Sequence, residues 1–175
     1  MEARISNRND REDEKGWLAW SRIGCNSINK SFGKTKTFRR YFAIFRGIII
    51  TAVEKLEKAH SRIVQLLSSK IIAEEIATNH NQRKYIFRDG SVLYIVYNTV
   101  GEYAYQLLFS TQKLDRVRFD CMDKKWDVRT KPNHIHPRYS ENAFESPMKG
   151  DVEQDIDLLV ECIKKGQLKD KDKRF

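Results

Sequence analysis

Two histidines in the stretch KPNHIHPRYS (131–140), His134 and His136, are the residues of this sequence best suited to chemistry. His136 precedes Pro137, and a residue before proline is pushed toward an extended backbone. Side chains two positions apart in an extended chain point to the same side, so we expect both imidazoles of this predicted loop to face one way. Imidazoles titrate near neutral pH, so one ring can take a proton from a nucleophile while the other gives one to a leaving oxygen. The pair therefore predicts acid–base chemistry with no metal or other cofactor.

RNA suits this chemistry because its own 2′-hydroxyl can act as the nucleophile. Arg138 follows the histidines, and its planar fork of donors matches phosphate oxygens. His134, His136 and Arg138 are therefore the candidate catalytic residues of a metal-independent endoribonuclease. The sequence contains no P-loop, nucleophile elbow or HExxH motif, so other common enzyme classes have no local support.

Two other interpretations of the histidine pair stay open. The first is a metal site in which Asp120, Asp123 or Glu145 supplies further ligands, although an HxH pair alone is a weak metal signal. In the second, the histidines only hold their loop by hydrogen bonds.

A surface for RNA is predicted beside the histidines. Tyr103 and Tyr105 share one face of a predicted strand, and Arg116 and Arg118 share one face of the next. Tyrosine beside arginine can stack bases and hold the backbone, so these four are candidate RNA-binding residues, with Asp120 as support. The structural alternative is that the tyrosines are ordinary strand residues and the arginines are the solvent face of an alternating strand.

Hydrophobic spacing predicts the elements that must position these residues. Apolar residues three and four apart predict a helix from about Val53 to Ile76, with His60 on its stripe as a packed residue rather than a ligand. Runs rich in Tyr, Phe, Val and Ile predict four strands, at 83–88, 91–98, 102–110 and 115–121.

Turn and cap residues complete the predicted fold. Asp89-Gly90, between the first two strands, indicates a type I′ hairpin turn. A second helix is expected from Asp151 to Lys165, with Asp151 in a capping arrangement and Gly166 as a stop. The fold class is therefore α+β, a four-stranded antiparallel meander packed by two helices.

Length and charge predict the domain organisation. A chain of 175 residues accommodates one domain, which we place at residues 52–166, followed by a charged tail at 167–175. Residues 1–50, with 11 Lys/Arg against five Asp/Glu, indicate a basic, poorly organised extension. This extension is either a flexible segment, a start assigned too far upstream, or an arm that binds nucleic acid.

Cysteine usage and hydropathy bear on the compartment. Three widely spaced cysteines support neither a disulfide framework nor a zinc ribbon, so a reducing cytoplasm is expected. The longest apolar run, at 41–53, is interrupted by Arg46 and is shorter than the roughly 20 residues that span a bilayer. No membrane partner is predicted, and homo-oligomerisation is left open.

Four stretches, EYAYQLLFS, LDRVRFD, HIHPR and ESPMKGDVEQDIDLL, resemble in this order the TumE-like proteins, prokaryotic toxins paired with the antitoxin TumA. The resemblance covers about residues 83–165. It implies that the histidine stretch, the Tyr103 and Tyr105 strand, and Arg118 with Asp120 match family motifs. It also implies a topology similar to RelE-like ribonucleases, a toxin that acts on RNA, and a helix-turn-helix antitoxin as partner. The alternative is a non-catalytic module that binds nucleic acid or protein.

Overall fold

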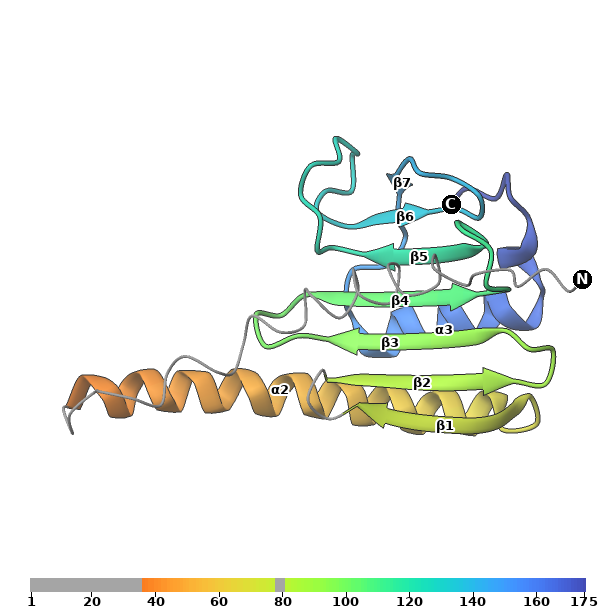
Figure 1. The fold of residues 1–175 in the computed structure, drawn as a ribbon. Helices are drawn as coiled ribbons and strands as arrows, with labels where there is room; N and C mark the ends of the chain where they lie inside the picture. The colour runs from red at the N-terminus through yellow and green to blue at the C-terminus, as the bar shows by residue number, and fades with distance from the viewer. Residues whose placement is uncertain (1–35, 78–80) are drawn as a thin grey trace, which may run out of the picture.

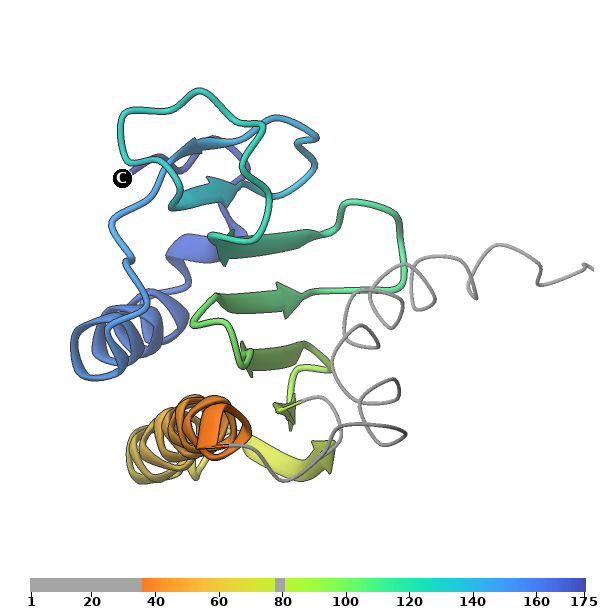
Figure 2. The same ribbon diagram turned by 90° about the vertical axis from the view of Figure 1, so that its left-hand side faces the viewer.

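In the part of the chain that the structure describes, one antiparallel sheet carries two α-helices on the same face (Figures 1 and 2). The computed structural model describes residues 36–77 and 81–175, with side chains from residue 51 onward. The α+β class and the antiparallel meander are confirmed, but the sheet has seven strands rather than four. Among the described residues, no helix combines the length and apolar character needed to cross a bilayer.

The strands follow sequence order across the sheet, each antiparallel to the next. The four predicted strands are β2 (Gln82–Phe87), β3 (Val92–Tyr97), β4 (Tyr103–Leu108) and β5 (Arg116–Asp120). The three additional strands lie at the edges: β1 (Ile71–Ala77) beside β2, and β6 (His134–His136) and β7 (Phe144–Glu145) beyond β5. The histidine pair thus lies in a short strand rather than in a loop.

The first helix, α2 (Lys36–Leu67), ends earlier than predicted. The Lys70 amide donates to the Leu67 carbonyl at 2.8 Å, which closes the last turn before Ile71. Residues 71–77 then pair with β2 instead of continuing the helix. Their isoleucines kept a helical spacing in the sequence, but β-branched side chains suit a pleated strand, and pairing with β2 satisfies the backbone.

The start of α2 also differs from the prediction. Residues 36–50 are helical, whereas the sequence placed them in the poorly organised extension. In Figure 1 this first half of α2 runs past the end of the sheet. The remainder of the predicted extension, residues 1–35, lies outside the described residues.

The turn between β2 and β3 is a hairpin, but it is not of type I′. The Phe87 amide donates to the Ser91 carbonyl at 2.9 Å, and the Gly90 amide donates to the Phe87 carbonyl at 3.0 Å. Within residues 87–91 only Gly90 has a positive φ, of 81°. This is the three-residue loop in which a left-handed glycine follows a type I turn, whereas type I′ needs two positive φ values.

The core fills the space between the sheet and the helices. His60 on α2 is half-buried, with Nδ1 3.1 Å from the Tyr85 hydroxyl, and so packs as the sequence predicted. The second helix, α3 (Val152–Lys164), matches the prediction, and Asp151 caps it by accepting from the amides of Glu153 and Gln154. The largest fully buried side chains include Ile63 from α2, Ile156 from α3, and Tyr85, Leu93, Ile95, Tyr105, Phe119 and Ile135 from the sheet.

The segment predicted as a charged tail packs against the domain. Residues 167–169 form a short 3-10 helix, η3 (Gln167–Lys169), in which Leu168 is 2% exposed. The Phe175 ring meets Phe119 edge-on, with ring centroids 5.7 Å apart. Leu168 therefore anchors the C-terminal segment in the core, while Phe175 remains 39% exposed.

A buried carboxylate fastens the start of α3 to the sheet. Asp155 Oδ2 accepts from the Tyr105 hydroxyl at 3.2 Å, from the Gly150 amide at 2.6 Å and from the Lys149 amide at 3.0 Å. Because Tyr105 donates to Asp155, the Tyr97 hydroxyl, 2.8 Å from that of Tyr105, is the donor of their shared hydrogen bond. Burial raises the pKa of Asp155 above its ordinary value. One side chain thus joins β3, β4 and the segment before α3.

We predict that Asp155→Ala lowers the free energy of unfolding by about 1–3 kcal/mol, because it leaves buried donors without an acceptor. Urea denaturation of the full chain, followed by circular dichroism, measures the change. Asp157→Ala is the matched control, since this carboxylate lies on the same helix and forms an exposed ion pair with Arg62. Equal losses in the two variants would contradict a special role for Asp155.

Candidate functional site

Strand β5 sends alternate side chains to opposite faces of the sheet. Val117 and Phe119 point toward the helices and are 3% and 1% exposed. Arg118 lies opposite His136 on β6, and Asp120 lies opposite His134. Because paired residues share a face, these four side chains lie together on the face that α2 and α3 leave uncovered, which we call the helix-free face (Figure 2).

Three of these residues form a compact group, the Asp120 cluster, which consists of Asp120, His134 and His136. One nitrogen or oxygen atom from each lies within 4.8 Å of the others. The two imidazole rings face the same side, as expected, with centroids 5.0 Å apart and planes nearly perpendicular at 84°. Strand alternation brings the histidines together, and the register of β5 with β6 adds the carboxylate.

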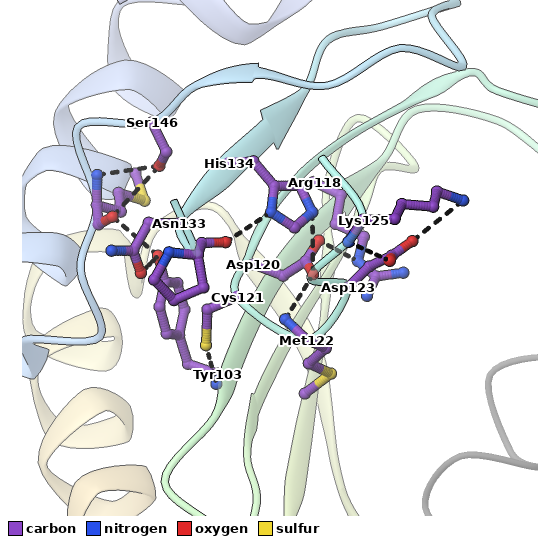
Figure 3. Close-up of polar contacts among 12 residues, drawn as sticks. Tyr103, Arg118, Asp120, Cys121, Met122, Asp123, Lys125, Asn133, His134 and Ser146 are labelled. Carbon is purple, nitrogen blue, oxygen red and sulfur yellow. Dashed lines mark hydrogen bonds and ion pairs between the residues drawn. The ribbon is translucent and has the colours of Figure 1, made fainter. Parts of the chain in front are cut away.

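Asp120 is fully buried and held from two directions (Figure 3). The Met122 amide donates to Oδ1 at 3.0 Å. Arg118 Nε lies 2.8 Å from Oδ2, in an ion pair. A buried carboxylate requires such partners, because an isolated charge in the interior costs several kcal/mol or more.

His134 is also fully buried, and its hydrogen bonding fixes the ring's tautomer. Nδ1 lies 2.8 Å from the Pro132 carbonyl oxygen, which only accepts, so Nδ1 carries the proton. In the neutral ring Nε2 then presents a lone pair, and it lies 3.4 Å from Asp120 Oδ1. No donor among the described residues hydrogen-bonds to Nε2. With a neutral ring, two buried acceptor atoms face each other, whereas a ring protonated at Nε2 would form an ion pair with Asp120.

His136 is half-buried, and it alone of the cluster reaches the surface. The Trp126 ring packs edge-on against it, with centroids 5.3 Å apart. Burial lowers the pKa of His136 to about 4. The Asp120 carboxylate opposes this shift, while His134, Arg118 and Arg116 act in the same direction as burial. His136 is therefore neutral at pH 7.

This asymmetry corrects the predicted two-histidine mechanism. Proton transfer by both rings requires both to meet the substrate, but His134 has 0% of its surface exposed. Its Nδ1 proton is used by Pro132 and its Nε2 faces Asp120. His136 is the histidine that can touch a ligand, and His134 belongs to the support beneath it.

Arg138 has partners that differ from the expected phosphate. Its Nε donates to Asp115, and Nη1 donates to the Lys169 carbonyl at 3.1 Å. Its guanidinium also lies over the Phe109 ring, 4.5 Å from the centroid. Arg138 thus joins the segment after β6 to the β4–β5 turn and to η3, and the structure gives it a positioning role instead of a catalytic one.

The tyrosines predicted to stack bases lie on the opposite face from the arginines. Tyr103 and Tyr105 are 1% and 0% exposed, and the Tyr103 hydroxyl donates to the Met148 carbonyl at 2.8 Å. The register explains the difference, because Tyr105 lies opposite Phe119, whereas Gln106 lies opposite Arg118. The predicted shared surface of tyrosine and arginine is therefore corrected: the two types belong to different faces.

The other predicted metal ligands lie outside the cluster. Asp123 accepts from the Lys125 amide at 3.2 Å and forms an ion pair with the Lys125 ammonium. Glu145 lies opposite His134 in the register but binds Arg129 at 2.8 Å. Of the three carboxylates considered from the sequence, only Asp120 joins the histidines.

Sequence reasoning missed the segment between β5 and β6, residues 121–133. Trp126 from this segment lies beside both histidines, with its centroid 6.4 Å from that of His134. The segment also carries four exposed cations, Lys124, Lys125, Arg129 and Lys131. The signal was present as a lone tryptophan among basic residues immediately before the histidines, but spacing alone did not indicate that the segment folds over them.

The ion pair of Asp115 with Arg138 should make stability depend on acid pH. Burial alone raises the pKa of Asp115, but hydrogen bonds from Arg138 and Ser110 outweigh it, and the pKa lies below its ordinary value. A lowered folded-state pKa stabilises the fold above the unfolded value of about 3.9, and this stabilisation is lost as pH falls through the folded pKa. We therefore expect Asp115→Asn to lower Tm most above about pH 5, with the gap to wild type closing toward pH 2–3.

Thermal melts across this pH range measure the gap. Glu141→Gln, which removes an exposed carboxylate 3.8 Å from Lys113, is the control and should leave Tm nearly unchanged. A gap that is constant with pH would show that Asp115 acts through packing rather than charge.

Comparison of the chain with protein-family models, with curated proteins and with solved structures finds no match.

Proposed function

We propose that this protein binds RNA through the helix-free face around Arg116, Arg118 and His136, as the toxin of a cytoplasmic toxin–antitoxin pair. The observation that carries the proposal is the position of the two arginines. They come from alternate positions of β5, and Arg118 lies opposite the half-buried His136. A phosphate group on this face would meet guanidinium donors and an imidazole together.

Charge around the site supports a polyanionic ligand. Residues 116–138 hold seven Lys/Arg against three Asp/Glu. Four of the seven, Lys124, Lys125, Arg129 and Lys131, are exposed on the segment beside the cluster. Clustered cations attract a phosphate backbone and release its counterions on binding.

Trp126 and His136 replace the tyrosines as the aromatic groups available to bases. Both are partly exposed, and their rings lie next to each other at 5.3 Å. Single-stranded RNA is recognised by stacking of unpaired bases on such rings, beside cations that follow the backbone. We therefore propose single-stranded rather than double-stranded RNA as the ligand.

Cleavage of the bound RNA is a second candidate function, favoured by the position of His136. A partly exposed imidazole beside two arginines can meet a 2′-hydroxyl while the arginines hold the adjacent phosphate. The resemblance to TumE-like toxins adds a partner, a helix-turn-helix antitoxin of the TumA kind. Without cleavage, the same face would serve a non-catalytic binding module.

Our RNA prediction concerns two exposed lysines on the segment between β5 and β6. Lys124→Ala with Lys131→Ala should weaken binding to single-stranded RNA, because two phosphate contacts are lost. The negative slope of log affinity against log salt should become shallower by about 1.4, which is roughly 0.7 for each lost contact. Fluorescence anisotropy at several salt concentrations measures both quantities.

The matched control is Lys164→Ala with Lys165→Ala at the C-terminal end of α3, a helix on the opposite side of the sheet, and it removes the same charge. This control should keep the wild-type salt slope. If both double variants weaken binding equally, net charge alone explains it. Wild-type protein that does not bind RNA would instead favour a protein-docking module.

Our cleavage prediction concerns His136. Overexpression of the wild type should arrest growth and leave cut RNA, and His136→Gln should reduce cleavage by about a hundredfold, the usual size of an acid–base contribution. His60→Gln, a half-buried histidine beside Tyr85, is the control and should stay toxic. Normal growth and intact RNA with wild-type protein would exclude cleavage and leave RNA binding as the function.

A further inference from the structure

We infer that the Asp120 cluster is a binding site for a divalent transition-metal ion, with Zn²⁺ as the type case. Asp120, His134 and His136 would each provide one ligand atom. The inference does not rest on the proposed RNA function, since the site is argued from its own geometry and is tested without RNA.

His134 has the hydrogen bonding of a metal ligand. Its Nδ1–H donates to the Pro132 carbonyl at 2.8 Å, which leaves the Nε2 lone pair directed into the cluster. Metal-binding histidines generally donate their second ring nitrogen to a carbonyl or carboxylate, because this fixes the tautomer and the ring orientation. His134 is also fully buried, so its orientation is set by packing.

The contact between His134 and Asp120 requires a positive charge. Nε2 and Oδ1 lie 3.4 Å apart, and no donor among the described residues hydrogen-bonds to Nε2. Two buried acceptors in contact repel each other unless a proton or a cation lies between them. Two ligand atoms of a tetrahedral Zn²⁺ site lie about 3.4 Å apart when each metal bond is 2.0–2.1 Å, so the observed spacing suits an ion.

His136 supplies the third donor and leaves a coordination position open. Its ring is part of the same 4.8 Å group of ligand atoms and is partly exposed. Three protein ligands with an accessible fourth position is the arrangement of catalytic rather than structural zinc sites. Two histidines and one carboxylate also suit iron, cobalt and manganese, so the proposed ion belongs to this class of divalent metals and is not zinc alone.

The surroundings hold the ligands in place. Arg118 Nε and the Met122 amide fix the Asp120 carboxylate at 2.8 and 3.0 Å. Trp126 packs beside both histidine rings, with ring centroids 6.4 Å from His134 and 5.3 Å from His136. Such supporting contacts determine metal affinity along with the ligands themselves.

Titration calorimetry with Zn²⁺ tests the site on the full chain after treatment with a chelator and its removal. Wild-type protein should bind one Zn²⁺ ion in the cluster, and Tm should rise with Zn²⁺ concentration. His136→Gln should weaken binding by about tenfold or more and remove the rise in Tm. This variant is decisive because His136 is half-buried, so the fold should survive; circular dichroism checks that it does.

Three controls make the result specific. Glu145→Gln changes a carboxylate opposite His134 that binds Arg129, and it should bind Zn²⁺ like wild type. His60→Gln removes a histidine beside Tyr85 and should have no effect. Substitution with Co²⁺ should give an absorption spectrum of nitrogen and oxygen ligands, without the thiolate bands that cysteine binding would produce.

The outcomes separate a metal from a proton. If wild-type protein binds no Zn²⁺, or if His136→Gln and wild type bind it equally, a proton on His134 Nε2 bridges to Asp120 and the inference is overturned. Thiolate bands from Co²⁺ in the tight site would also overturn it. A loss of RNA binding in any of these variants bears only on the proposed function, because Zn²⁺ binding is measured in the absence of RNA.

Discussion

The pairing of β5 with β6 is the constraint on which the candidate site depends. Successive side chains of a strand point to opposite faces, so a shift of one residue would exchange the two faces of β6. The observed register puts Asp120 opposite His134 and Arg118 opposite His136, while Phe119 pairs with Ile135 in the core. The buried Phe119–Ile135 pair holds that register, because its loss would expose two large apolar side chains.

Among the described residues, α2 and α3 cover one face of the sheet, and the core and the candidate site lie on opposite faces. On the covered face, Tyr103 and Tyr105 bury their rings and direct their hydroxyls to the Met148 carbonyl and to Asp155. Buried hydroxyls need such partners, and Asp155 provides one while it fastens α3. The helix-free face carries polar and charged side chains, and on this face the arginines of β5 lie beside the histidines of β6.

Within the site, differences in burial give the two histidines different roles. Asp120 and His134 are fully buried, and contacts with Arg118, Met122 and Pro132 fix the positions of their side chains. His136 is the member of the Asp120 cluster that reaches the protein surface, beside Trp126. Acid–base catalysis by His136 and the proposed ion exclude each other, because a metal-bound imidazole has no lone pair left to take a proton. RNA binding is compatible with the ion, since a cation held by the Asp120 cluster and the two arginines of β5 would both attract a phosphate oxygen. In that case the ion, rather than a second histidine, would stabilise charge on the phosphate.

The sequence by itself determined the local elements and the local geometry. The alternating runs predicted β2 to β5, Asp151 and Gly166 marked the ends of α3, and the HxH spacing put both imidazoles on one side. These features follow from strand period, capping and backbone preference, which act over a few residues. Only the tertiary structure decided which face of β4 packs on the helices, and therefore that the tyrosines are core residues and Gln106 neighbours Arg118. It also turned 71–77 into a strand, engaged Arg138 with Asp115, and set Asp120 against His134, because each of these depends on a partner outside the segment itself.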